Sequence, residues 1–262
     1  MAQNASVNRK GNSNRSGFFF KEALPAQAKV YIAAVILGGF SVFFFCLYRS
    51  FTQADLRWLY LAGLTVLASC FPVKIPLLKS KAHSLTITVS DVFVFAAILF
   101  LGPAVAVTLA VVDGLTSSLR VGVKRLYKQL FNLAQLALVA FVVGQVFSQL
   151  EKPMPLQSVQ LMGLTGLLVE MAFCGLIYFF LNSSAVALAM ALVTQQQFSE
   201  LWTRNFLWAL PANSIHAFTA ASVFLVFRPI TFSVVIAILP LLGVVYYARR
   251  IQFYRIQQTS SV

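Results

Sequence analysis

The sequence is poor in charge, and above all in acidic residues. Only 10% of its 262 residues are charged, with seven Asp or Glu against 20 Lys or Arg. Soluble domains carry about 25% charged residues. Apolar residues make up 59% of the chain and recur in runs as long as the hydrocarbon layer of a bilayer is thick. That pattern excludes an ordinary soluble domain and predicts an all-α, polytopic membrane protein built as a helical bundle.

Cysteine is also scarce, and no motif for catalysis or metal binding is visible. The three cysteines (Cys46, Cys70 and Cys174) all lie in apolar runs, where thiols act as small hydrophobic groups rather than as disulfides or metal ligands. No Ser or Cys stands in a nucleophile motif beside a base, and no glycine-rich phosphate loop is present. We therefore expect no metal, no cofactor and no enzymatic activity.

The apolar runs predict about eight membrane spans within one domain. Their expected positions are residues 30–48, 56–73, 84–102, 103–119, 126–148, 157–181, 205–227 and 229–248. A basic N-terminal arm, 1–24, is expected to be disordered or interfacial because it is rich in Asn, Ser, Arg and Gly. The membrane domain would cover residues 25–248, and a short basic tail, 249–262, would follow it.

The distribution of positive charge predicts the orientation. With the N-terminus inside, 16 of the 20 Lys and Arg fall on one side, and only Arg49, Arg57, Lys152 and Arg228 on the other. Cytoplasmic loops carry the excess of Lys and Arg, so both termini should be cytoplasmic. The net charge of +13 is then explained by topology and by anionic lipid headgroups at the cytoplasmic loops, not by nucleic acid.

Two stretches are ambiguous. Residues 183–200 hold an apolar run too short to cross a membrane alone, so we expect a cytoplasmic continuation of the sixth helix or an interfacial helix; two short broken spans are the alternative. The segment "SLTITVSD", 84–91, alternates as a strand does. An isolated strand cannot satisfy its backbone in lipid, and we therefore expect a helix there.

Several polar residues lie inside the predicted spans, at similar depths. From the helix rise of 1.5 Å per residue, they fall about 9 to 18 Å from the cytoplasmic ends of their spans. Ionisable groups at such depth normally face protein or water, and small residues beside them let helices approach closely. We predict one polar, ligand-binding cavity lined by Asp91, Asp113, Asn132, Gln135, Glu170, Asn213 and His216.

Each of these residues also has a purely structural interpretation. Asn132 and Gln135 are equally suited to hydrogen bonds with a neighbouring helix, and His216 to an interhelical hydrogen bond. Asp91 could cap a broken helix through its carboxylate. Asp113, followed by a glycine in mid-span, and Glu170, in mid-helix, are hardest to explain by structure alone, so these two carry the functional hypothesis.

Four phrases resemble a known family of membrane domains. They are "FPVKIP", "SLTITVSDVFVFAAILFLGPAVAV", "RLYKQLFNLAQLALVAFVVGQVF" and "RPITFSVVIAILPLLGVVYYARRIQFYR". Together they resemble the bacterial membrane-associated sensor (MASE type) domains that precede GGDEF or HD-GYP output domains. The resemblance covers roughly residues 56–255. It implies a sensory module of the bacterial inner membrane whose last span continues into a cytoplasmic output domain. Because this sequence ends at "IQFYRIQQTSSV", we expect either a stand-alone sensor-like protein that acts on a partner or the loss of the output domain.

Two functions follow as hypotheses. The first is a membrane sensor-like module that binds a small ligand or lipid-derived cue and passes the signal to a cytoplasmic partner. The second is a substrate-binding subunit of an energy-coupled vitamin or metabolite transporter, because the layout is also similar to such subunits. Ala106 and Ala110 in "AVAVTLA" supply small residues of the kind with which those subunits dock their transporter partners, although this spacing is common in helical bundles.

Overall fold

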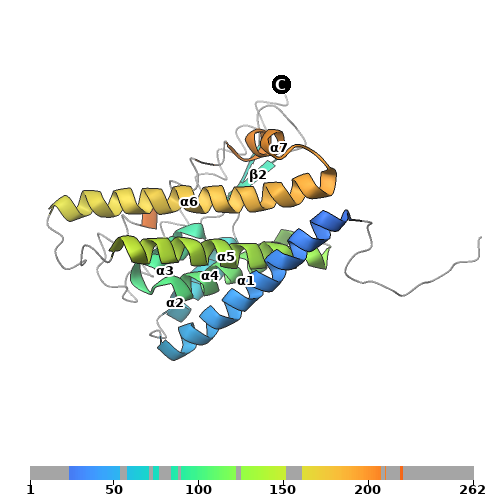
Figure 1. Ribbon diagram of the computed structural model, residues 1–262. Helices are drawn as coiled ribbons and strands as arrows, with labels where there is room; N and C mark the ends of the chain where they lie inside the picture. The colour runs from blue at the N-terminus through green and yellow to red at the C-terminus, as the bar shows by residue number, and fades with distance from the viewer. Residues whose placement is uncertain are drawn as a thin grey trace, which may run out of the picture.

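The fold is a bundle of helices. The computed structural model describes residues 24–53, 58–70, 73–76, 84–87, 90–121, 125–151, 161–207, 210 and 219–220. Within these ranges it holds seven helices and one pair of short strands (Figure 1). Three helices are long and apolar enough to cross a membrane: Ala26–Thr52, Leu126–Leu150 and Gly166–Thr194. The predicted class, a helical membrane protein, is confirmed in this part of the chain.

Helix α5 (Leu126–Glu151) is the centre of the bundle. In the most apolar stretch of 18 residues, 61% of α5 is buried, compared with 17% of α1 (Ala26–Gln53). It packs against α1, against α4 (Pro103–Val121) and against α6 (Leu161–Thr194), and Figure 1 shows it between α6 and α1. The polar residues in the first half of α5 are therefore surrounded by protein on several sides.

Glycines allow α5 to approach its neighbours closely. A Cβ atom added to Gly39 of α1 would overlap the backbone of Ala134. On the other side, a Cβ on Gly144 would lie 2.8 Å from the Cβ of Pro103. Close contact through small residues is the main way in which membrane helices gain packing energy, so these two crossings fix α5 between α1 and α4.

Helices α2 (Trp58–Ser69) and α3 (Asp91–Phe100) are shorter than predicted. The sequence suggested spans at 56–73 and 84–102, but 12 and 10 residues give lengths of only about 18 and 15 Å. Neither crosses a hydrocarbon core of about 30 Å by itself. Both pack against α4, and consequently the end of α2 and the start of α3 lie inside the bundle.

The prediction of a helix from residue 84 is wrong for residues 84–87. They form strand β2 (Ser84–Ile87), which pairs antiparallel with β1 (Val73–Pro76) in the register Val73↔Ile87. The argument for a helix assumed an isolated strand, and a paired strand instead satisfies much of its backbone through its partner. The alternation of "SLTITVSD" was the correct signal. The predicted boundary between residues 102 and 103 is confirmed, because Gly102 adopts a positive φ of 87° between α3 and α4.

Helix α6 continues without a break through residues 183–194, as the first interpretation of that stretch expected. Its 34 residues measure about 51 Å, much more than a hydrocarbon core, so one part of α6 extends beyond the apolar layer. A short helix, α7 (Phe198–Asn205), follows it. The predicted spans 205–227 and 229–248 lie almost entirely outside the described residues, as do the arm and the basic tail.

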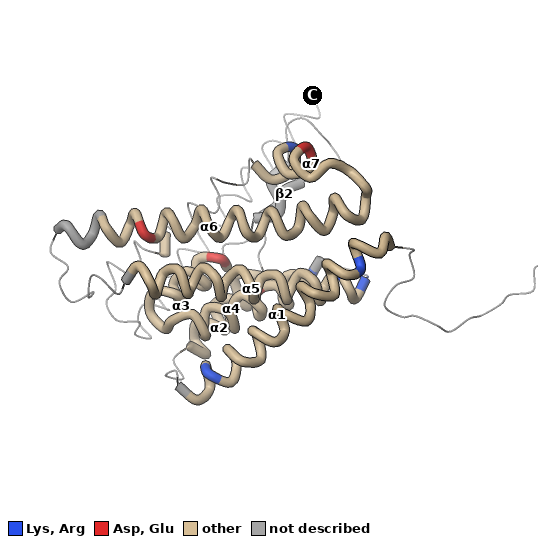
Figure 2. The backbone as a smooth tube through the Cα atoms, in the orientation of Figure 1, with Lys and Arg blue, Asp and Glu red and all other residues tan. Residues whose placement is uncertain are grey.

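The two ends of the bundle differ in charge. At one end α1 and α5 begin and α4 finishes, which brings Lys29, Arg120 and Lys128 to the same end; we call it the basic end. Arg49 lies near the opposite end, in the last turns of α1. Figure 2 shows basic residues near both ends of α1 and on α7, whereas the middle of α5 and of α6 carries none.

Candidate ligand-binding site

A buried carboxylate lies where α2 ends. The Ser69 hydroxyl, in the last turn of α2, donates a hydrogen bond of 2.5 Å to Oδ1 of Asp113, in the middle of α4. Asp113 is 6% exposed and Ser69 1% exposed. An acid at such a place normally interacts with protein groups or with a ligand, and here the first partner comes from the interior end of a short helix.

Other polar side chains surround Asp113. Asp91, the first residue of α3, is close enough for its charge to act on Asp113, and the Tyr178 hydroxyl of α6 hydrogen-bonds Asp91. The hydroxyls of Ser90 and Ser117 also interact with the Asp113 carboxyl group, and both oxygens are buried. We call these residues the acid cluster. Its members are Ser69 of α2, Ser90 and Asp91 at the start of α3, Asp113 and Ser117 of α4, and Tyr178 of α6.

The carboxamides of α5 lie beside this cluster. Gln135 is 1% exposed, and its Nε2 donates to Oδ1 of Asn182 at 2.6 Å. The Asn132 side chain faces α4 at Gly114, the residue after Asp113. The interhelical interpretation is thus confirmed for Gln135. Its Oε1 is nevertheless buried and has no hydrogen-bond partner among the described residues, so within that part of the chain one interior acceptor is unused.

The remaining predicted residues do not join the acid cluster. Glu170 lies two turns before Tyr178 on α6, about 12 Å nearer the start of the helix, and therefore at another depth. Asn213 and His216 lie outside the described residues. Asp91, Asp113, Asn132 and Gln135 are the predicted residues that the structure places in one region.

Sequence reasoning missed several members of this region. Tyr178 and Asn182 continue the helical face of Glu170 and Cys174 at a spacing of four residues, and that signal could have found them. Ser117 follows Asp113 by four residues on α4, so the same spacing could have found it. Ser69 and Ser90 could not be found in this way, because serine is common in membrane helices and only the ends of α2 and α3 bring these two hydroxyls to Asp113. Among the described residues, no group of His, Cys, Asp and Glu is arranged to hold a metal ion.

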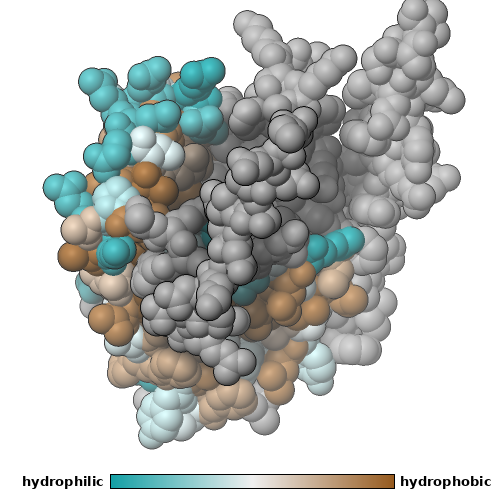
Figure 3. Space-filling model, turned by 90° about the vertical axis from the view of Figure 1, so that its right-hand side faces the viewer, coloured by the Kyte–Doolittle hydropathy of each residue, from teal (hydrophilic) through white to brown (hydrophobic). Residues whose placement is uncertain are grey.

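A cavity of about 550 Å³ lies at the basic end and extends toward this region. It is called the basic-end cavity. Ser117 belongs both to its wall and to the acid cluster, and therefore connects the two. Residues of four helices line the cavity: Ile32, Ser117, Ser118, Tyr127, Lys128, Phe131, Asn132, Val186, Ala189, Met190, Val193 and Thr194. Figure 3 looks at this end of the bundle, with hydrophilic residues gathered at the top, near α7, and apolar residues below.

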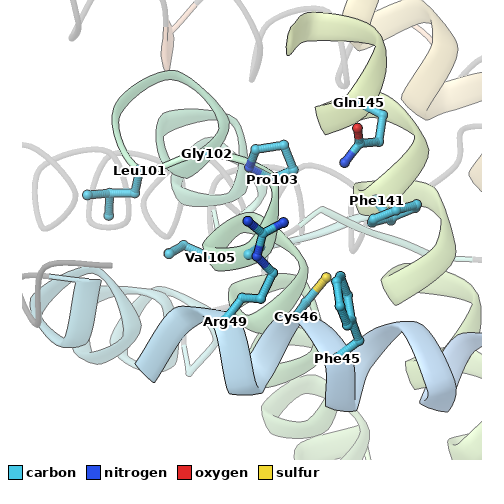
Figure 4. Close-up of a pocket in the computed structure, with 10 residues that line it drawn as sticks. Phe45, Cys46, Arg49, Leu101, Gly102, Pro103, Val105, Phe141 and Gln145 are labelled. Carbon is cyan, nitrogen blue, oxygen red and sulfur yellow. The ribbon is translucent and has the colours of Figure 1, made fainter. Parts of the chain in front are cut away.

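A second cavity, of about 510 Å³, lies at the opposite end. In Figure 4 the Arg49 side chain of α1 points toward Gly102 and Pro103, and Gln145 of α5 extends from the other side. The guanidinium of Arg49 lies 5.8 Å from the centroid of the Phe45 ring. This cavity shares no residue with the acid cluster, which makes Arg49 a suitable control for effects at the basic end.

The fold and the buried acid cluster define a helical membrane protein with polar groups gathered inside its bundle. Residues 41–254 match MASE9, a family of membrane-associated sensor domains, and the chain belongs to this family. The resemblance seen in the sequence is confirmed. No curated protein and no solved structure matches the chain, and nothing in the comparisons supports the transporter-subunit hypothesis.

Proposed function

We propose that the chain is an inner-membrane sensor domain that binds a small ligand or lipid-derived cue at the acid cluster and passes the change to a cytoplasmic partner. The observation that carries this proposal is the meeting of two interior helix ends at a buried acid, Asp113. Irregular backbone at membrane depth is tolerated where protein covers it or where it lines a cavity. In this proposal the chain itself catalyses no reaction.

The proposed topology has both termini cytoplasmic. Of the eight predicted spans, α2 and α3 are too short to cross alone, and without these two as full spans the other helices keep the sides expected for them. The basic end then faces the cytoplasm, in agreement with the bias of Lys and Arg in membrane proteins. The described residues are consistent with this arrangement, since α1 and α5 begin and α4 finishes at the same end. The basic-end cavity would accordingly open near the inner headgroups, and the acid cluster would lie deeper.

Helix α6 is suited to carry the signal. Tyr178 and Asn182 contact the polar region, and the next residue, Ser183, accepts a hydrogen bond of 2.9 Å from Nε1 of Trp202, in α7. The Trp202 ring also stacks on Phe180, with centroids 5.8 Å apart. A shift of α6 caused by a ligand would therefore move α7 with it, on the side that we place in the cytoplasm.

A thermal-stability screen of the purified protein against small metabolites and lipids tests the proposal. A ligand at 100 times its dissociation constant should add about 2.7 kcal/mol to the stability of the folded state. We expect Asp113→Asn to abolish the stabilisation. The matched control is Ser50→Ala, which removes a buried interhelical contact with Thr108 away from the cluster and should leave the ligand effect intact. Equal loss in both variants would contradict a site at Asp113.

A further inference from the structure

The basic-end cavity combines apolar walls with one positive charge. Ile32 of α1 and Val186 and Val193 of α6 supply apolar surface. Lys128, in the first turn of α5, lines the cavity with its Nζ 6.0 Å from the Tyr127 ring centroid. Within the described ranges no acidic side chain forms an ion pair with Lys128. The charge at the cavity is therefore not balanced by a described residue.

We propose that this cavity binds an anionic amphiphile, with one hydrocarbon chain along the walls of α1 and α6 and its negative head at Lys128. The inference rests on the proposed function, because it names the ligand class of the same sensor. Ser117 and Asn132 on the inner wall supply hydrogen-bonding groups at the side nearest the acid cluster. An anionic head and an apolar chain together use both kinds of surface.

The size and position of the cavity favour an amphiphile over a soluble anion. About 550 Å³ lies within the range of 300–1,000 Å³ that is typical of ligand pockets, enough for a single chain. A Lys at a helix end lies at the level of the headgroups. Beside the cavity, α1 exposes large apolar residues, with Val30 and Leu37 each 70% exposed, so hydrocarbon chains reach this side of the bundle directly.

Two sources supply this chemistry, a free fatty acid and one chain of an anionic bilayer phospholipid. The test uses the full chain in nanodiscs of phosphatidylcholine with a fatty acid that carries a photoreactive diazirine. After illumination, labelled peptides are mapped by mass spectrometry. We expect labelling concentrated in residues 186–194 and competed by oleate or by phosphatidylglycerol, but not by oleyl alcohol. Competition by oleate alone identifies a free acid, and competition by phosphatidylglycerol alone identifies a bilayer lipid.

Variants isolate the role of the charge. Lys128→Gln should raise the oleate concentration needed for half-maximal competition about tenfold, as expected for loss of a charge-assisted contact, whereas Lys128→Arg should change it little. Arg49→Gln, which alters the cation beside the other cavity, is the matched control. Lys128 is exposed, so its substitution should leave folding intact. Ala189→Phe, which fills the cavity from α6, should reduce labelling of residues 186–194 by a second route.

Two results would overturn the inference. One is labelling spread evenly over the lipid-facing surface of α1, which would show ordinary contact with the bilayer. The other is equal competition by oleate and oleyl alcohol, which would remove any recognition of charge. The labelling does not depend on signalling. A chain that is labelled as expected, but in which neither this lipid nor Asp113→Asn alters output, would refute the proposed function and leave the binding site in place.

Discussion

Ser69 and Asp113 should be energetically coupled through their hydrogen bond, and a double-mutant cycle measures this coupling energy. The cycle compares Ser69→Ala, Asp113→Ala and the double variant, because alanine removes the acceptor oxygen that Asn would keep. Hydrogen bonds between membrane helices average about 0.6 kcal/mol and reach about 1.7 kcal/mol. A bond of 2.5 Å to a buried carboxylate belongs at the upper limit, because bonds to ionised groups are shorter and stronger than neutral ones. We expect a coupling of about 1.5 kcal/mol.

A second cycle within the same bundle provides the reference. Ser50 and Thr108 join α1 and α4 through two buried neutral hydroxyls, 3.2 Å apart. Their cycle should give about 0.6 kcal/mol. Both cycles can be measured by unfolding in mixed micelles with increasing dodecyl sulfate, followed by far-ultraviolet circular dichroism. A coupling for Ser69 and Asp113 no larger than that of the neutral pair would refute the view that α2 is held at the acid cluster by a strong polar contact.

Two further predictions concern packing. Gly39→Leu should destabilise the protein by about 1–3 kcal/mol in the same unfolding assay, because a side chain there overlaps Ala134. Gly38→Leu should be nearly neutral, because no atom of the described residues lies within 4 Å of a Cβ at Gly38. Equal losses would argue against the close crossing of α1 and α5. Trp202→Phe removes the hydrogen bond to Ser183, which is worth about 1 kcal/mol. Hydrogen exchange of the backbone amides in residues 198–205 should therefore become faster. An unchanged exchange rate would show that α7 is held by other contacts.

The long elements could be predicted from the sequence, and the interior helix ends could not. The apolar runs located α4 and α5 nearly to the residue, since hydrocarbon-length runs have few alternatives in a membrane. The same rule overestimated α2 and α3, whose apolar composition resembles that of a full span. Hydropathy does not show where a helix ends inside the protein, and the pairing of β2 with β1 depends on partner residues 8 to 14 positions away in the sequence.

For the candidate site too, some features could be predicted from the sequence and others could not. The depth estimate correctly placed Asp91 and Asp113 close together, because helix rise converts sequence position into depth. It also assigned Glu170 to the same cavity, although this residue lies at a different level on α6. Depth alone cannot give the direction in which a side chain points or the neighbour that it meets. Tyr178 was overlooked for a related reason, since an aromatic residue in an apolar run is usually read as lipid-facing.

The most direct test of the account is whether a ligand at the acid cluster moves α6 and α7. Spin labels would be placed at Leu119→Cys, at the end of α4, and at Thr203→Cys, in α7, both exposed positions, after alanine replaces the native cysteines. Pulsed electron resonance then measures the distance between them with and without a ligand that stabilises the parent protein but not Asp113→Asn. The account predicts a shift of about 2 Å, the size of helix movements in switching proteins. An unchanged distance with the ligand bound would contradict it.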